Sequence, residues 1–239
     1  MKVTFIIPNF NQLFYLKNLI NWIGWYHPDR KQYPIVIIDN NSSYQPLLDY
    51  YKEVLNGKVE ICMEDKNDCA ANLRWYIDNM LDTEWYAIID PDILPCPNTP
   101  YNYLDYFIKA IESGYHHAGF DLVTEDLPAW LEKRDSIIYD ENLCREEKLY
   151  FEGIECYRGA IDTTFALYRK SNGGWYAPMS GKDWSNAIRM FKAFHYKWYI
   201  DPQRINPELD NYFKTATFRD LTSGISAGKN YFRPKSYEK

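Results

Sequence analysis

The chain has 239 residues, of which 46% are hydrophobic, and a formal net charge of -6 at pH 7. This length and apolar content are enough to bury a sizeable core, and they favour one α/β domain spanning residues 1–239. The negative charge argues against a general nucleic-acid binder, because such proteins carry an excess of Lys and Arg that neutralises phosphates. We therefore expect no nucleic acid among its partners.

The cysteine content and the first apolar run indicate the cellular compartment that we expect for the protein. The five cysteines are odd in number and include no Cys-x-x-Cys spacing, which favours neither a zinc site nor a disulfide framework. The run over residues 3–8 is too short for a signal peptide and far too short to cross a membrane. We expect a cytoplasmic protein without a transmembrane segment.

The first half of the chain, residues 1–95, alternates between predicted strands and helices. Residues 3–8 form a strand stopped by Pro8, and residues 9–12 form the loop and cap of a helix that ends at Gly24. A second strand over 34–39 ends in Asp39, and a helix over 44–55, a strand over 59–63 and a helix over 70–81 follow. This alternation predicts parallel strands with right-handed crossovers in a three-layer sandwich.

The fourth predicted strand, residues 85–89, delivers two carboxylates at its end. Asp90 and Asp92 flank Pro91, which has no backbone donor to continue the ladder. Ligands of open parallel sheets bind outside the carboxyl ends of the strands, and hard cations such as Mg²⁺ or Mn²⁺ prefer oxygen ligands. The pattern favours a metal site whose shell a diphosphate completes. The alternative is an ordinary acidic turn, since Asp and Pro are common turn residues.

The second half, residues 96–239, is less regular. We predict a helix over 104–111, a strand over 116–122, a partly helical excursion over 129–158 and a strand over 159–169. A capped helix over 206–213 precedes a basic tail.

Three segments carry a resemblance to a known family. Val3-Thr-Phe-Ile-Ile-Pro-Asn-Phe-Asn11, Ile38-Asp-Asn-Asn-Ser42 and Asp90-Pro-Asp92 resemble the opening strand and nucleotide loop, the base-contacting second strand and the Asp-x-Asp motif of GT-A glycosyltransferases. The family-2-like group is the most similar, and later segments resemble its small bacterial and viral members. In departure from that group, the loop at Asn67 lacks a glycine, and Gly181-Lys-Asp-Trp184 matches the usual Glu-Asp motif only in part.

The resemblance implies a fold, a reaction and a set of site residues. The fold is an α/β, Rossmann-like GT-A sandwich with a mostly parallel central sheet and a mixed C-terminal half. In that fold, residues 1–95 are expected to bind the nucleotide, and residues 96–239 to bind the acceptor and carry the catalytic base. The reaction is metal-dependent transfer of a hexosyl or deoxyhexosyl group from a nucleoside-diphosphate sugar, with UDP as first choice, to a hydroxyl of a glycan or similar acceptor, with inversion expected. The metal is Mn²⁺ or Mg²⁺. The implied nucleotide contacts are Pro8, Asn9, Asn11, Asp39, Asn67, Arg74, Asp90 and Asp92.

The metal ligands and Asp39 each have a competing interpretation. We expect Asp92 to bind the metal directly and Asp90 to reach the ribose or a metal-bound water. His195 is implied as a further ligand, although a histidine among Tyr and Trp is by itself more often structural. For Asp39 we favour a role in base binding over a structural role in an Asx turn, because we expect Asp39 and Asp90 to end neighbouring strands of the sheet.

An inverting transfer needs a carboxylate that deprotonates the acceptor. Asp162 is our first candidate, because its predicted strand register places it on the more polar face, and a loop-capping role is the alternative. Asp183 is the next candidate. Asp121 and Asp126 lie in an acidic stretch where a solvated role is expected.

Three other classes of protein are alternatives to a glycosyltransferase. A sugar nucleotidyltransferase would need a glycine-rich basic loop after the first strand, and a dinucleotide oxidoreductase would need Gly-x-Gly-x-x-Gly there. The segment Pro8-Asn-Phe-Asn11 has no Gly, Lys or Arg. A non-catalytic sugar- or nucleotide-binding protein of the same fold would differ by its lack of metal-dependent donor hydrolysis.

Overall fold

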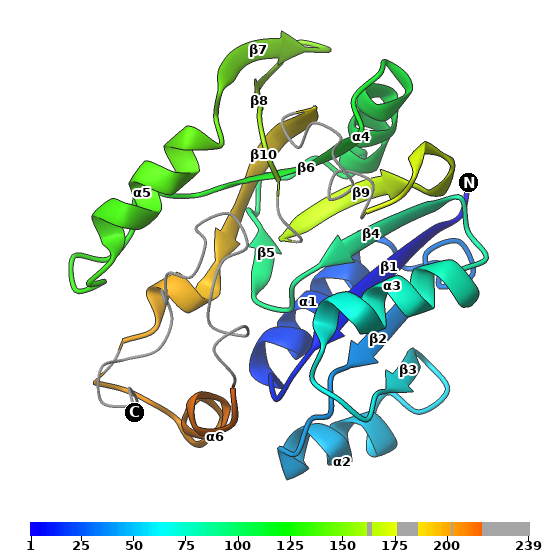
Figure 1. The fold of residues 1–239 in the computed structure, drawn as a ribbon, viewed down its shortest axis with the longest axis vertical. Coiled ribbons are helices and arrows are strands. Elements are labelled where there is room, and N and C mark those ends of the chain that lie inside the picture. Colours follow the sequence, from blue (N-terminus) through cyan, green and yellow to red (C-terminus); the bar gives the residue numbers. More distant parts are fainter. Residues whose placement is uncertain (162–163, 176–185, 202, 217–239) are drawn as a thin grey trace.

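The apolar runs of the first half form parallel, buried strands in a computed structural model of the chain (Figure 1). The structure describes residues 1–161, 164–175, 186–201 and 203–216. The elements of the first half are β1 (Val3–Asn9), α1 (Phe14–Tyr26), β2 (Ile35–Asp39), α2 (Gln45–Glu53), β3 (Glu60–Met63), α3 (Cys69–Asn79), β4 (Trp85–Ile89) and β5 (Ile93–Pro95). Those of the second half are α4 (Tyr103–Glu112), β6 (His117–Leu122), α5 (Arg134–Leu143), β7 (Glu147–Phe151), β8 (Ile154–Arg158), β9 (Phe165–Arg169), β10 (Ala187–His195) and α6 (Pro207–Thr215).

The strands make one sheet in the order β3-β2-β1-β4-β9-β6-β10-β8-β7, with β5 paired to β10. The neighbours from β3 to β4 are parallel. Beyond β4 the sheet is mixed, because β9 runs antiparallel to both β4 and β6 while β10 is parallel to β6. The carboxyl ends of β1, β2, β4, β6 and β10 therefore share one edge, which also receives the start of β9.

Helices cover both faces of the sheet and make a three-layer sandwich. Apolar residues of α1, α2 and α4 pack in one cluster with Phe5, Ile37 and Ile89. The alternate residues Ile6, Ile38 and Ile88 face the other way, toward α3. This alternation follows from the two-residue period of a strand. The predicted three-layer α/β sandwich with a mixed C-terminal half is therefore confirmed.

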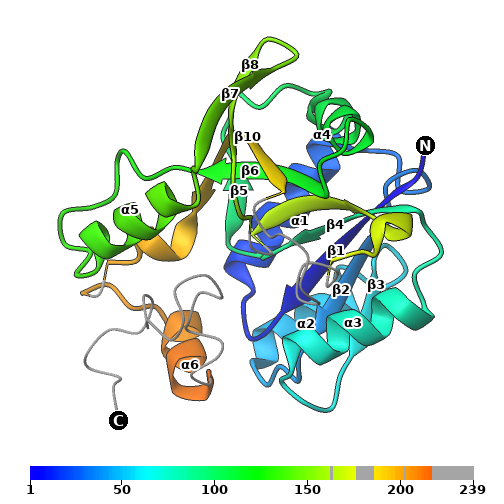
Figure 2. The same ribbon diagram turned by 45° about the horizontal axis from the view of Figure 1, so that its top comes forward.

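The excursion over 129–158 contains more strand than predicted. It comprises α5 followed by the hairpin β7–β8, which turns at Glu152 and Gly153, both with positive φ. Such a turn matches the twist of the flanking strands. The hairpin lies at the end of the sheet opposite β3 (Figure 2).

Three local predictions are wrong. Pro8 does not end β1, which continues to Asn9, because the ladder with β4 has already stopped at Ile6 and Pro8 is paired only with β2. The strand predicted over 159–169 begins only at Phe165. Asp39 and Asp90 do not follow neighbouring strands, since β1 lies between β2 and β4.

Within the part of the chain that the structure describes, no helix is long and apolar enough to span a membrane.

Candidate functional site

Two segments about 100 residues apart meet at the carboxyl edge of the sheet. The short strand β5 pairs antiparallel with the end of β10, with Ile93 opposite His195. The backbone N–H of Tyr196 donates to the carbonyl of Asp92 at 2.8 Å and extends this contact. The pairing places the Asp90-Pro-Asp92 turn directly beside the end of β10, so Asp92 and His195 lie side by side. Their binding of a metal stays a prediction.

Asp92 Oδ2 is the point on which two nitrogen atoms converge. It lies 3.3 Å from His195 Nδ1 and 3.6 Å from Lys197 Nζ. The His195 ring is stacked on Trp198 with centroids 4.6 Å apart and an interplanar angle of 8°. All of these side chains are buried, so the carboxylate, the imidazole and the ammonium interact with little screening by water.

Burial and charge set the protonation of this group. Burial lowers the pKa of His195 to about 4, against the opposing effect of Asp92, so the ring is neutral near pH 7. Burial also disfavours ionised Asp92, but the Lys197 ammonium, His195 and hydrogen bonds together outweigh it, so the pKa of Asp92 lies below its ordinary value. Burial by itself lowers the pKa of Lys197, yet Asp92, Tyr212 and Asp90 together raise it above its ordinary value, so the Asp92–Lys197 pair is ionised.

Asp90 lies at the same turn with part of its surface exposed. Its backbone N–H donates to the Thr164 carbonyl at 3.1 Å, and its own carbonyl accepts from the N–H of Ile93 at 3.1 Å. These bonds link the end of β4 to the chain that enters β9. Asp90 also contributes to the raised pKa of Lys197, after Asp92 and Tyr212, which places its charge close to the same ammonium.

The loops after β1 and β2 interlock through Asn11 and Asp39. Asn11 has a φ of 52°, a conformation that Asn adopts more readily than most residues. Its N–H donates to Ser42 Oγ at 2.8 Å, and its Oδ1 accepts from the N–H groups of Ser43 and Tyr44 at 2.7 and 2.9 Å. Asp39 accepts from the N–H of Ser42 at 2.7 Å. The segment 42–44 is thereby fixed beneath the carboxyl edge.

Asp39 is fully buried. Its Oδ2 accepts from the hydroxyl of Tyr51 at 2.8 Å, and the same hydroxyl accepts from Nδ2 of Asn9 at 2.8 Å. Burial raises the pKa of Asp39 against the opposing hydrogen bonds from Ser42 and Tyr51. The carboxylate therefore holds the loop together in this structure, and its contact with a base stays a prediction. Pro8, which precedes Asn9 in β1, is also buried.

The remaining predicted nucleotide residues lie around α3. Asn67 is in the loop before this helix, whose N-terminus is capped by Asp68 through the N–H of Ala71. Arg74 lies on an exposed face of α3 and pairs with Asp78 at 3.6 Å. An exposed i,i+4 pair contributes little to stability, so the geometry gives Arg74 a solvated surface position.

Helix α6 joins the nucleotide loop to the Asp92 group, which the sequence did not indicate. Glu208 accepts from the N–H groups of Leu13 and Phe14 at 2.9 Å and so caps the start of α1. Thr215 Oγ1 accepts from Nδ2 of Asn11 at 2.9 Å. Tyr212 receives a hydrogen bond from Lys197 Nζ at 3.1 Å. Residues three apart on a helix share a face, so Asn11 and Lys197 contact adjacent positions of α6.

The prediction that residues 9–12 cap α1 is wrong, because Glu208 of α6 caps this helix instead. Residues 9–12 supply no side chain that caps this helix, and its N-cap residue Leu13 makes no side-chain cap bond. The carboxylate of Glu208, almost 200 residues later, fills that role and also complements the positive end of the helix dipole. Local sequence patterns carry no signal for such a long-range cap.

Asp121 is buried, so its expected solvated role is wrong. Its carboxylate is contacted by Arg145 Nε at 3.0 Å, Arg189 Nε at 3.0 Å and Lys192 Nζ at 2.7 Å. Its carboxylate is thus held in ion pairs with three cationic side chains. Asp126 accepts from the Tyr199 hydroxyl at 2.5 Å.

The two candidate bases, Asp162 and Asp183, lie outside the described residues.

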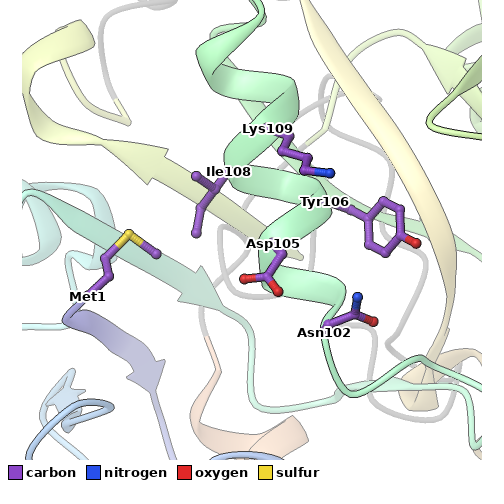
Figure 3. Close-up of a pocket in the computed structure, with 6 residues that line it drawn as sticks. All are labelled: Met1, Asn102, Asp105, Tyr106, Ile108 and Lys109. Carbon is purple, nitrogen blue, oxygen red and sulfur yellow. The ribbon is translucent and has the colours of Figure 1, made fainter.

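A hollow of about 340 Å³ lies elsewhere on the molecule, along the first turns of α4 (Figure 3). Met1 lines it and precedes β1, so the hollow is at the amino end of the sheet, opposite Asp92. Its other lining residues are Asn102, Asp105, Tyr106, Ile108 and Lys109. None of them belongs to the predicted site.

The donor set at Asp92 and His195 suits a divalent ion. Two adjacent ligands of an octahedral ion are about 3 Å apart when each lies at about 2.1 Å, close to the observed 3.3 Å. In the described residues, no three His, Cys, Asp or Glu side chains are grouped so that they could hold an ion by themselves. Mg²⁺-like ions commonly take one or two protein ligands and complete their shell with water and substrate phosphates.

The sheet order and the position of the site can be compared with solved structures. The structure superposes on GalNAc-T7, solved with UDP, GalNAc and Mn²⁺, with a TM-score of 0.55 and 14% identity over 82% of this chain and 44% of that one. It superposes on S. aureus TarS 1–349 with a TM-score of 0.51 and 14% identity over 83% of this chain and 62% of that one. The chain has the GT-A fold of glycosyltransferases. It spans less than two thirds of either neighbour, and no protein-family model and no curated protein matches it.

The contact between α6 and α1 gives the first prediction. Glu208→Ala should lower the free energy of unfolding by about 1–3 kcal/mol, because two partly buried N–H groups lose their acceptor and the helix dipole loses a counter-charge. Urea unfolding followed by circular dichroism measures the change. Asp210→Ala, on the same helix but paired with Lys214 at the surface, is the matched control and should stay within about 0.5 kcal/mol of the original. Equal losses in both variants would contradict the capping role.

Proposed function

We propose that the protein is a metal-dependent glycosyltransferase that moves a sugar from a nucleoside-diphosphate sugar to a hydroxyl of a glycan or similar acceptor. The observation that carries the proposal is the meeting of Asp92 and His195 at the carboxyl edge of a GT-A sheet, 3.3 Å apart. A turn that served only to reverse the chain would not need a buried carboxylate facing a buried imidazole. Burial of such groups is costly unless they are paired or bind a ligand.

Asp92 and His195 would hold Mn²⁺ or Mg²⁺ directly, and Asp90 would contact the ribose or a metal-bound water. When bound, the ion offsets the negative charge that develops on the departing diphosphate. Neutral His195 has the protonation state that ligation requires. The ring stack with Trp198 holds its orientation.

The nucleotide would lie over the loops that Asn11 and Asp39 fix. Pro8, Asn9, Asn11, Asp39 and Asn67 are the proposed contacts from the first half, and Arg74 would have to leave its pair with Asp78 to join them. UDP is the first choice of nucleotide. Support comes from the sequence resemblance and from GalNAc-T7, the neighbour solved with UDP and Mn²⁺.

Asp162 is the proposed base, with Asp183 as the next candidate. Support for Asp162 comes from its place in the chain, two residues before Thr164, whose carbonyl accepts from the N–H of Asp90 at 3.1 Å. The transfer would then proceed with inversion, as a carboxylate removes the acceptor proton while the sugar is attacked from the face opposite the diphosphate.

Asp92→Asn tests the metal assignment. The amide keeps the shape of the side chain but is a much poorer metal ligand, so Mn²⁺-dependent binding of UDP should weaken at least about 10–100-fold. Isothermal titration calorimetry of UDP with and without Mn²⁺ measures it. Asp82→Asn removes an exposed carboxylate paired with Lys2 and should bind as the original protein does. Unchanged Mn²⁺-dependent binding by Asp92→Asn would sink the assignment.

Asp162→Asn tests the base. Loss of a general base should reduce turnover by roughly 10²–10⁴ while UDP affinity and melting temperature stay near those of the original protein. Release of UDP from the preferred UDP-sugar, with Mn²⁺ present, is the assay. Near-normal turnover, or a large drop in melting temperature, would return Asp162 to a structural role and make Asp183→Asn the next variant.

A further inference from the structure

Lys197 is a buried cation at the centre of the proposed metal site, and the reaction outlined above gives it no role. Its ammonium lies 3.6 Å from Asp92 Oδ2 and 3.1 Å from the hydroxyl of Tyr212, and it also lies over the Tyr212 ring at 4.7 Å from the centroid. The side chain is only 8% exposed. Water therefore screens its charge poorly, and any second cation placed nearby meets strong repulsion.

The ammonium and the imidazole approach the same oxygen. His195 Nδ1 and Lys197 Nζ are 3.3 and 3.6 Å from Asp92 Oδ2. An ion held by Asp92 and His195 would draw on the same carboxylate that the ammonium contacts, so the two cations would compete for Asp92. If the ammonium leaves Asp92, it still has the Tyr212 hydroxyl as a hydrogen-bond partner. Tyr212 belongs to α6, the helix that also contacts Asn11 of the nucleotide loop.

The net charge of the site changes as each ligand binds. Counting only these three side chains among the described residues, Asp90 and Asp92 contribute two negative charges and Lys197 one positive charge, a sum of one negative charge before any ligand binds. A divalent ion alone turns this into one positive charge in a poorly hydrated place, which is unfavourable. A nucleotide-sugar diphosphate adds two negative charges, and the full complex returns to the single negative charge of the free site.

We propose that Lys197 makes metal binding depend on the nucleotide: its ammonium holds Asp92 in the free protein and moves to the diphosphate when ion and nucleotide bind together. This inference rests on the proposed function and assigns Lys197 as a positioning residue of that same site. Removal of its charge would leave a neutral site after the ion binds alone, and two excess negative charges once the diphosphate joins. The variant should therefore bind the ion better alone and gain less from the nucleotide.

The experiment compares Mn²⁺ binding with and without UDP, followed by the loss of the free Mn²⁺ electron paramagnetic resonance signal. Lys197→Gln removes the charge but keeps a donor for Tyr212. Its affinity for Mn²⁺ alone should rise about tenfold, and the enhancement of Mn²⁺ affinity by UDP should fall about tenfold, a size typical of coupled sites. Lys197→Arg keeps the charge and should keep the enhancement. Lys214→Gln, a surface change on α6, is the matched control.

The possible outcomes separate the two proposals. If the unmodified protein binds no Mn²⁺ in the presence of UDP, the proposed function fails. If it binds both ligands and Lys197→Gln shows the same Mn²⁺ affinity and the same enhancement, only the role of Lys197 is overturned. Should Lys197→Gln unfold too readily for titration, Lys197→Met carries the same expectation. The rise in melting temperature produced by Mn²⁺ alone must then be larger in that variant than in the unmodified protein, and an equal rise overturns the inference.

Discussion

The antiparallel pairing of β5 with the end of β10 is the constraint on which the site depends. It involves only three residues of β5, yet it brings the turn after β4 beside a segment about 100 residues later. Without it, Asp92 would be a buried carboxylate with no counter-charge, which is strongly destabilising. With it, Asp92 gains His195 and Lys197 at once. The same contact therefore stabilises the fold and assembles the chemistry proposed for it.

Helix α6 extends this arrangement to the nucleotide side. Glu208 caps α1, Thr215 contacts Asn11, and Tyr212 accepts from Lys197, so one short helix contacts both the loop after β1 and the Lys197 side of the proposed donor site. A ligand that moves the Lys197 ammonium would act on the same helix face that contacts the nucleotide loop. The fold thus gives a physical route by which the ion and the nucleotide affect each other, through contacts among adjacent residues.

The sequence predicted the features that depend on local patterns. Buried strands at 85–89 and 35–39 follow from their apolar runs, and the expected nearness of Asp92 and His195 came from a family resemblance. The sequence did not predict β5, which is too short to show a period, or the Glu208 cap, which joins residues far apart. Asp121 was misread because its burial depends on Arg145, Arg189 and Lys192, which the fold brings to it. Lys197 was overlooked because a lone lysine has no pattern.

The most direct measurement of the central claim is electron spin-echo envelope modulation of Mn²⁺ bound to the protein with UDP, since it detects nitrogen atoms coordinated to the ion. The account predicts modulation from one imidazole nitrogen that disappears in His195→Gln, while the variants of the other histidines, His27→Gln, His116→Gln and His117→Gln, retain it. Bound Mn²⁺ that shows no imidazole modulation, or modulation that persists in His195→Gln, would contradict the account.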